Sequence, residues 1–150
     1  MAEWPRFDDK KRLNEEGEAF VNSRPTGALV TIGADGYPHA TPLGFYRVGD
    51  DLYMSGRRRT QRVVNIERNP KVCFLVEAGS KMSDFRGLII RGDAEVISDD
   101  AEKLRVARAG AEQRGEPEEK WPTEPPRGTL IRVMPKRYSS WDNSRAQGPG

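Results

Sequence analysis

Apolar residues are distributed along this chain in short runs that are typical of β-strands. Residues 27–33 form a continuous apolar, β-branched run that is too short for a globular helix, so we predict a buried strand there. The Asp-Gly pair at 35–36 supplies the positive φ angles of a tight hairpin, and residues 37–47 are the predicted antiparallel partner. Pro38 and Pro42 cannot donate to a strand ladder, which puts this partner at a sheet edge or against a non-protein group.

Four further strands follow from the same pattern of short apolar runs. They are predicted at residues 52–55, 72–77, 85–97 and 129–134. The segment 85–97 alternates most clearly, so one of its faces is expected to be exposed to water. The six predicted strands occur in hairpin order, without the strand-helix-strand rhythm of a parallel sheet. We therefore predict a mainly β fold of the α+β class, an antiparallel barrel with helices on its outside.

Three short helices are predicted between these strands. Mixed charged and apolar residues at 8–23 suggest an amphipathic helix. A second helix is predicted for residues 60–68, with Thr60 at its N-cap and an Asn-Pro pair to stop it. A third helix begins after two aspartates at 99–100. Its apolar face is expected to contain Ala101, Leu104, Ala107 and Ala111.

The composition fits one domain with little apolar surface of its own. The chain has 150 residues, of which 35% are hydrophobic, and both ends are rich in charge, Pro and Gly. Residues 1–150 are therefore predicted to form a single domain, with frayed ends at 1–8 and 143–150. A partner subunit is expected to cover apolar surface.

Charge and termini exclude several classes of partner. The formal net charge is only +2, so the whole molecule has little long-range attraction for nucleic acid or anionic lipid. No stretch resembles a signal peptide or reaches the length of a membrane span, and we predict a cytoplasmic protein without a membrane partner. Cys73 lies in an apolar run and is interpreted as a small buried hydrophobe rather than a nucleophile.

The most informative segment runs from Ser55 to Arg62. A strand ends there, Gly56 allows close approach of the backbone, and Thr60 stands where a helix begins, an arrangement whose free N–H groups bind anions. Residues 57–71 contain six basic residues and one acidic residue. A guanidinium can bind phosphate through two parallel hydrogen bonds. Two other interpretations remain open at this point, namely a surface helix with solvated arginines and a nucleic-acid patch, against which the near-neutral total charge counts.

Several motifs together resemble the flavin-binding split-barrel superfamily, which includes pyridoxamine 5'-phosphate oxidases and deazaflavin-dependent reductases. The matching motifs are Asp35-Gly36-Tyr37-Pro38-His39, Thr41-Pro42-Leu43, Leu52-Tyr53-Met54-Ser55-Gly56-Arg57, Thr60-Gln61-Arg62 and Asn65-Ile66-Glu67-Arg68-Asn69-Pro70-Lys71-Val72. The spacing from Arg62 to Asn65 and to the Asn-Pro pair is the specific part. The resemblance implies a six-stranded antiparallel split β-barrel with short flanking helices.

The resemblance also implies a cofactor site. The expected cofactor-binding residues are Thr41, Pro42, Leu43, Met54, Ser55, Gly56, Arg57, Arg58, Thr60, Arg62 and Trp141. Among them Arg58, Thr60 and Arg62 would be the phosphate ligands, while the residues at 41–43 and 54–56 would line the tricyclic ring. Members of the superfamily are homodimers with the cofactor at the subunit interface, so Trp141 would pack against the cofactor of the partner, or else simply cover an edge.

FMN and the deazaflavin coenzyme F-420 are the two candidate cofactors. The run of three arginines at 57–59 favours the more anionic F-420, whereas FMN is widespread in the superfamily. The expected function is that of an oxidoreductase that acts on a small organic substrate by hydride transfer, with no assigned catalytic side chain and no metal. The alternative is a non-catalytic flavin- or haem-binding or storage protein. His39 is interpreted as a solvent-facing residue after the turn rather than a catalytic group or haem ligand.

Overall fold

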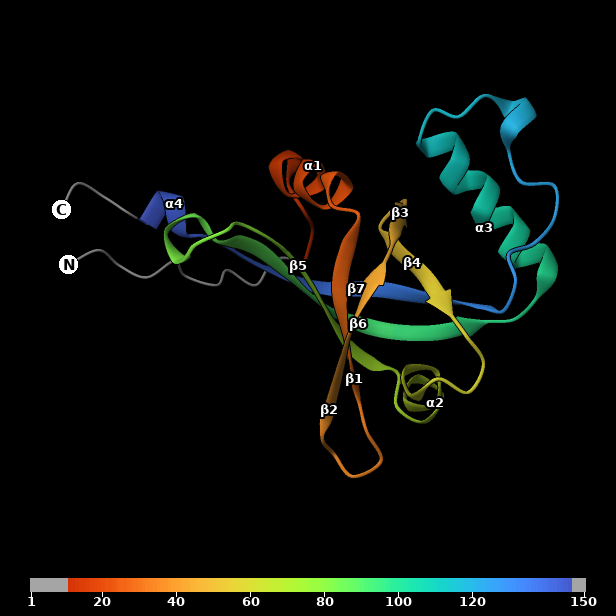
Figure 1. Cartoon of the computed structure of the whole chain (residues 1–150), viewed down its shortest axis with the longest axis horizontal. Helices are drawn as coiled ribbons and strands as arrows, with labels where there is room; N and C mark the ends of the chain where they lie inside the picture. The colour runs from red at the N-terminus through yellow and green to blue at the C-terminus, as the bar shows by residue number, and fades with distance from the viewer. Residues whose placement is uncertain (1–10, 147–150) are drawn as a thin grey trace.

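The computed structural model describes residues 11–146, which form one curled, mostly antiparallel sheet flanked by short helices (Figure 1). The strands are β1 (Thr26–Ile32), β2 (Pro38–Gly44), β3 (Tyr46–Val48), β4 (Asp51–Gly56), β5 (Lys71–Ala78), β6 (Arg86–Ile97) and β7 (Thr129–Asp142). The α-helices are α1 (Glu15–Ser23), α2 (Gln61–Arg68), α3 (Asp100–Gln113) and α4 (Asn143–Ala146), and two single 3-10 turns lie at Met82–Asp84 and Glu118–Lys120.

The two end strands of the sheet are joined by the covalent chain and not by hydrogen bonds, so the barrel is not a complete ring. Its strand order is β2-β1-β5-β6-β7-β4-β3, so the two end strands are consecutive in sequence and are separated only by Phe45. The predicted strand at 37–47 is thus bent into two short strands, one pairing with β1 and the other with β4. The predicted antiparallel, mainly β split barrel is confirmed, with seven strands instead of six because of this bend.

Strand β2 is an edge strand, as its prolines predict. The amide of Gly33 donates to the carbonyl of Tyr37 at 2.8 Å, so these two opposite residues form a hydrogen-bonded pair. Such pairs alternate along an antiparallel ladder, and the odd-numbered residues of β2 are therefore the ones that exchange hydrogen bonds with β1. The nitrogens of Pro38 and Pro42 therefore point away from β1. The prolines remove two donors from the free edge and none from the ladder.

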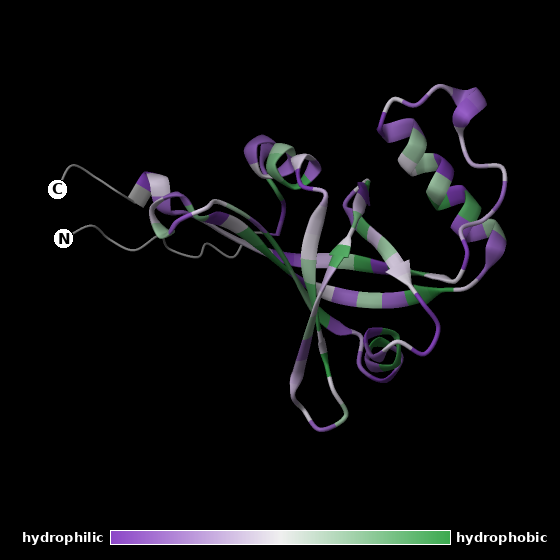
Figure 2. Ribbon diagram, in the orientation of Figure 1, coloured by the Kyte–Doolittle hydropathy of each residue, from purple (hydrophilic) through white to green (hydrophobic). Residues whose placement is uncertain are grey.

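The core lies inside the curl of the sheet. Phe74 and Leu29 are fully buried there and pack among other apolar strand residues, while Val63 and Ile66 reach in from α2. A smaller apolar cluster on the other side of β4 contains Tyr53 and Val106 and attaches α3 to the sheet. Each of the longer helices carries both apolar and polar bands (Figure 2), in line with packing through one face.

Helix α3 begins at the predicted aspartates, and its buried face overlaps the predicted one at Ala111 alone. Asp99 is the N-cap and accepts a hydrogen bond from the amide of Glu102 at 2.9 Å. The buried positions include Lys103 and Val106 rather than Leu104 or Ala107. Burial of Lys103 is possible because its ammonium group donates to the carbonyls of Pro126 and Gly128, at 3.0 and 2.7 Å, which fastens the proline-rich loop to the helix.

Strand β7 is longer than predicted because a bulge lets it continue past Pro135. Arg91 of β6 pairs with Arg137, and the next residue, Gly92, pairs with Pro135, so Lys136 is the extra residue on β7. A Cβ atom on Gly92 would overlap the carbonyl of Met134, which explains the glycine at this point. Pro135 is tolerated at this bulge, where β7 pairs with β6 but no longer with β4, whose pairing ends at Val133.

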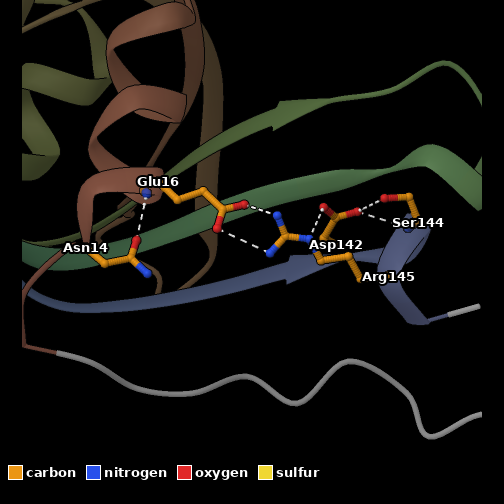
Figure 3. A network of polar contacts seen from close by, with 6 residues as sticks. Asn14, Glu16, Asp142, Ser144 and Arg145 are labelled. Carbon is orange, nitrogen blue, oxygen red and sulfur yellow. Dashed lines mark hydrogen bonds and ion pairs between the residues drawn. The ribbon is translucent and has the colours of Figure 1, made fainter. Parts of the chain in front are cut away.

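The two ends of the described chain lie against each other. Helix α1 begins only after Asn14, whose side chain accepts from the amide of Gly17, so it is shorter than the predicted helix at 8–23. Residues 143–146 form α4, where Arg145 forms an ion pair with Glu16 of α1 (Figure 3), and the fraying expected for this segment stays a prediction. The other residues expected to fray, at 1–8 and 147–150, lie outside the described residues.

Candidate anion-binding site

The connection from β4 to α2 is a tight turn between the sheet and the first turn of a helix. Gly56 ends β4 under close contacts, since a Cβ atom there would lie 2.9 Å from Oγ1 of Thr129 and 3.1 Å from a methyl carbon of Val63. Arg59 has a φ of 66°, an uncommon conformation for a residue with a side chain. The turn thus brings the chain sharply from the end of a strand into the start of α2.

The hydroxyl of Thr60 does not cap the helix. Thr60 is the N-cap residue, but its Oγ1 donates to the carbonyl of Arg57 at 2.9 Å, and in the described part of the chain no side chain caps the first turn of α2. The backbone N–H groups of this first turn lack the partners that a capped helix has. They are therefore available to an anion, and the partial positive charge of the helix N-terminus favours one.

Positive charge gathers around this turn. Arg57, Arg58 and Arg59 are all exposed, and Arg62, the second residue of the helix, is half-buried. The Arg62 guanidinium lies against the end of β4, with Nη2 at 3.5 Å from the carbonyl oxygen of Ser55. Its Nε is buried and has no hydrogen-bond partner within the described chain. A buried N–H of a guanidinium requires an acceptor, so this geometry fits a bound oxyanion.

Helix α2 is held in place by a buried polar contact with β1. The fully buried amide of Asn65 donates to Oγ1 of Thr31 at 3.0 Å and accepts from the amide of Gln61 at 2.7 Å. Arg68 donates to the carbonyl of Ile32 from the same helix. These contacts fix the position of α2 on β1 and with it the position of Arg62. The Arg62-to-Asn65 spacing that carried the resemblance therefore has a structural reason.

Strand β2 contributes two faces to the region. Thr41 and Leu43 pair with Leu29 and Gly27, so their side chains lie on the inner face of the sheet and are partly buried. Pro42 lies on the opposite, exposed face. The segment 41–43 therefore does not form one continuous side-chain surface, although β2 runs next to β4, whose end carries the turn.

The remaining expected site residues are spread over both ends of the sheet. Ser55 is exposed at the end of β4, whereas the Met54 side chain is 1% exposed and packed in the core, so Met54 can reach a ligand at this turn only with its backbone. Trp141 lies at the far end of β7 from the Thr129–Gly56 pair, roughly 40 Å along the strand at about 3.3 Å per residue. Within one chain, Trp141 does not join the other residues, and its indole instead packs on Gly87 of β6.

Sequence reasoning missed two residues of this region. Asn65 was noted only for its spacing, and its burial depends on tertiary packing that no local pattern reveals. His39 was interpreted as solvent-facing, but it is partly buried on the inner face of β2, and its Nδ1 is buried without a partner. The i, i+2 spacing of His39 and Thr41 on a strand could have indicated their shared face.

Two further features of the described chain bear on metal binding and on the thiol of Cys73. Within residues 11–146 no group of three or more His, Cys, Asp or Glu side chains could hold a metal ion. Cys73 is half-buried on β5, and burial raises the pKa of its thiol, with Arg91 opposing this effect. A raised pKa disfavours the thiolate, which agrees with the interpretation of Cys73 as an apolar residue.

In the described range 11–146, no helix is both long and apolar enough to cross a membrane.

The arrangement fits a phosphate ester, as the cofactors implied by the resemblance would require. An uncapped helix start, an unpartnered Nε on Arg62 and three further arginines offer donors and positive charge in one place. The described residues near the turn present few acidic groups, since Glu67 is the one acidic residue in 57–71.

Comparisons with known proteins point to one family from sequence and from shape. The family model described as pyridoxamine 5'-phosphate oxidase matches residues 13–142. A conserved hypothetical protein from Mycobacterium tuberculosis is similar in structure, with 28% sequence identity, a TM-score of 0.71 and 94% of each chain covered. An F-420 reductase is 25% identical, with a TM-score of 0.61 over 85% of this chain and 98% of that chain.

A more distant structure agrees in fold. The FAD-binding protein from Mycobacterium smegmatis is 22% identical, with a TM-score of 0.60 over 85% of this chain and 93% of that chain. No curated protein matches the chain. Since the family model extends from just before α1 to the last residue of β7, and the split barrel agrees with it, the chain belongs to the pyridoxamine 5'-phosphate oxidase family.

Proposed function

We propose that this protein is a flavin- or deazaflavin-dependent oxidoreductase that acts on a small organic substrate by hydride transfer. The observation that carries the proposal is the unpartnered, buried Nε of Arg62 beside the uncapped N-terminus of α2. A dinegative phosphate ester satisfies both, because it accepts from a guanidinium and from backbone amides. The family membership and the similarity to an F-420 reductase support a cofactor of this class.

In this proposal the chain's own residues bind and orient the cofactor. Arg62 and the first amides of α2 hold the phosphate, Thr60 shapes the turn through its bond to the carbonyl of Arg57, and Arg58 adds charge from the solvent side. The cofactor, when bound, supplies the hydride chemistry. The free edge of β2 and the end of β4 flank the ring and shield it from water.

The number of arginines favours a cofactor with more than one anionic group. Arg57, Arg58 and Arg59 are exposed in addition to Arg62, and one phosphate uses few of their donors. F-420 has further carboxylates in its tail, whereas FMN carries the phosphate alone. Both cofactors belong in the test below.

We further propose that the protein acts as a homodimer with the cofactor between the subunits. Val30, Leu75 and Ile89 lie on the outer face of the sheet, opposite the buried Leu29 and Phe74, and remain partly exposed. The same face has a groove of about 500 Å³. A second copy that covers this face would bury it, and would also bring a distant Trp141 to the cofactor of its partner.

The central test is cofactor affinity in Arg62→Ala. Titration with FMN and with F-420, followed by fluorescence, should show at least a tenfold loss of affinity for the cofactor that the parent protein binds, which corresponds to about 1.4 kcal/mol. Arg105→Ala is the matched control, because Arg105 is an exposed arginine on α3, away from the turn. Equal affinities for Arg62→Ala and the parent would refute the phosphate site.

Three measurements separate the other parts of the proposal. Turnover with reduced nicotinamide or reduced F-420 distinguishes an oxidoreductase from the non-catalytic binder, which would retain the cofactor without turnover. A Soret band on adding haem would identify a haem binder. Light scattering should give a dimeric mass for the parent and a monomeric mass for Leu75→Asp, while Tyr37→Asp, at a position 75% exposed, should remain dimeric. A monomeric parent would contradict the dimer.

A further inference from the structure

Five buried side-chain atoms have no hydrogen-bond partner within the described chain, and three of them belong to β2 and α2. These three are Nδ1 of His39, Oγ1 of Thr41 and Nε of Arg62. Buried polar groups in folded proteins are almost always paired, so each of these atoms calls for a partner from outside the chain. The first two belong to β2 and the third to α2.

The strand register puts His39 on the side of the sheet that α2 covers. His39 is directly opposite Thr31 in the β1–β2 ladder, and directly opposed residues project from the same face of the sheet. Thr31 is fully buried under α2, where its Oγ1 accepts from the amide of Asn65. His39 therefore borders the contact between α2 and the sheet. Thr41 lies two residues along β2 on the same face.

Arg62 belongs to the same region because it lies one helical turn before Asn65. On a helix, residues three apart share a face, so Arg62 projects from the same face of α2 as Asn65, toward the sheet rather than into solvent. The half-buried state of Arg62 and its contact with the carbonyl of Ser55 agree with this orientation. Two elements thus present unpartnered polar groups from opposite sides, β2 from one and α2 from the other.

The chemistry of the three groups selects an oxyanion. The Nε of an arginine can only donate, the hydroxyl of threonine can donate, and the Nδ1 of histidine donates whenever it carries the proton. A phosphate oxygen accepts from all three. We infer that His39 and Thr41 form the second wall of the anion site, and that His39 is a specificity-determining residue that contacts the phosphate of the cofactor rather than its ring. This inference rests on the proposed function.

The test compares cofactors with and without their phosphate. FMN is paired with riboflavin, and F-420 with its phosphate-free chromophore, against the parent protein, His39→Leu and His39→Asn. Leucine removes the polar atoms at similar volume, while the amide nitrogen of asparagine can stand in for Nδ1. His39→Leu should lose about tenfold in affinity for the phosphorylated cofactor, about 1.4 kcal/mol, with less than about a twofold change for the phosphate-free compound. His39→Asn should stay within about threefold of the parent for both compounds.

Further variants keep the result interpretable. Thr41→Val removes only the hydroxyl and should change the phosphorylated-to-free affinity ratio in the same direction as His39→Leu. Melting curves establish that each variant is folded, and a merely structural role for His39 would not move this ratio. If Arg62→Ala weakens FMN or F-420 while His39→Leu leaves the ratio unchanged, the inference is wrong and the proposed function stands. If the parent binds none of the four compounds, both are wrong.

Discussion

The contact between Asn65 and Thr31 should contribute measurably to stability, although neither residue touches solvent. Both side chains are fully buried, and the Asn65 amide both donates to Thr31 at 3.0 Å and accepts from Gln61 at 2.7 Å. Asn65→Leu preserves the shape of the side chain and removes both bonds. Two hydrogen bonds at about 1 kcal/mol each, and a buried threonine hydroxyl left without a partner at about 1 to 2 kcal/mol, predict a loss of about 3 to 4 kcal/mol.

Thr31→Val should cost less, because it removes one bond and leaves the Asn65 carbonyl oxygen paired, although the buried Asn65 amide nitrogen loses its acceptor. One bond at about 1 kcal/mol and one buried donor without a partner at about 1 to 2 kcal/mol predict a loss of about 2 to 3 kcal/mol. The double variant joins two apolar side chains at the contact and leaves no donor or acceptor of that pair unsatisfied. Its loss should therefore be smaller than the sum of the two single losses by about 1 kcal/mol or more.

Urea unfolding of the four proteins at one fixed concentration, followed by circular dichroism, measures this coupling. An unchanged dependence of the unfolding free energy on urea would show that the comparison concerns stability alone. Strictly additive losses, or a loss below about 0.5 kcal/mol in Asn65→Leu, would refute the reasoning that this buried pair anchors α2. Asn65→Leu should also weaken cofactor binding, because α2 carries Arg62.

Two further predictions concern the far end of the barrel. Gly87→Ala should displace the indole of Trp141, since a Cβ atom at 87 would overlap the ring, and we expect a loss of about 1 to 3 kcal/mol with a shift in tryptophan fluorescence. Gly44→Ala should have neither effect, because a Cβ atom there would lie 3.8 Å from the carbonyl oxygen of Pro25, an ordinary contact. The pKa of Asp84 is lowered, chiefly by the hydrogen bond that its carboxylate accepts from the Lys81 amide. The charged carboxylate therefore stabilises its loop fully above the unfolded pKa of about 4. This stabilisation is lost as the pH falls through the lower, folded pKa. Hydrogen-exchange protection of the loop at 80–84 should fall over that range in the parent, and Asp84→Asn should remove this pH dependence.

The strands were predictable because each one carries its own local signal. The β1 run and the Asp-Gly turn specify a hairpin by themselves, and the prolines of β2 indicate an edge without any knowledge of the partner strands. The second half of β7 was missed because Pro135 and the basic pair after it contradict a strand pattern. The bulge that tolerates them depends on the pairing of Gly92, which lies more than forty residues away.

The candidate site was predictable in charge but not in geometry. The arginines around α2 are visible in the sequence, and so is the glycine before them. Two details depend on the packing of α2 against β1. One is which of the arginines is half-buried. The other is that the Thr60 hydroxyl donates to the carbonyl of Arg57 instead of capping the helix. The partial burial of His39 likewise depends on tertiary packing. A single polar residue after a turn does not reveal from its own sequence context whether it faces solvent or a neighbouring helix.

The prolines of β2 have a consequence for the edge of the sheet that does not pair with β1. With amide hydrogens at residues 38 and 42, this edge would present donors at every second residue, and another strand could add to it. Without these two hydrogens a complete ladder cannot form on this side of β2. Substitutions that restore them, such as Pro42→Val, would therefore favour pairing of this edge with the same edge of a second copy and promote aggregation.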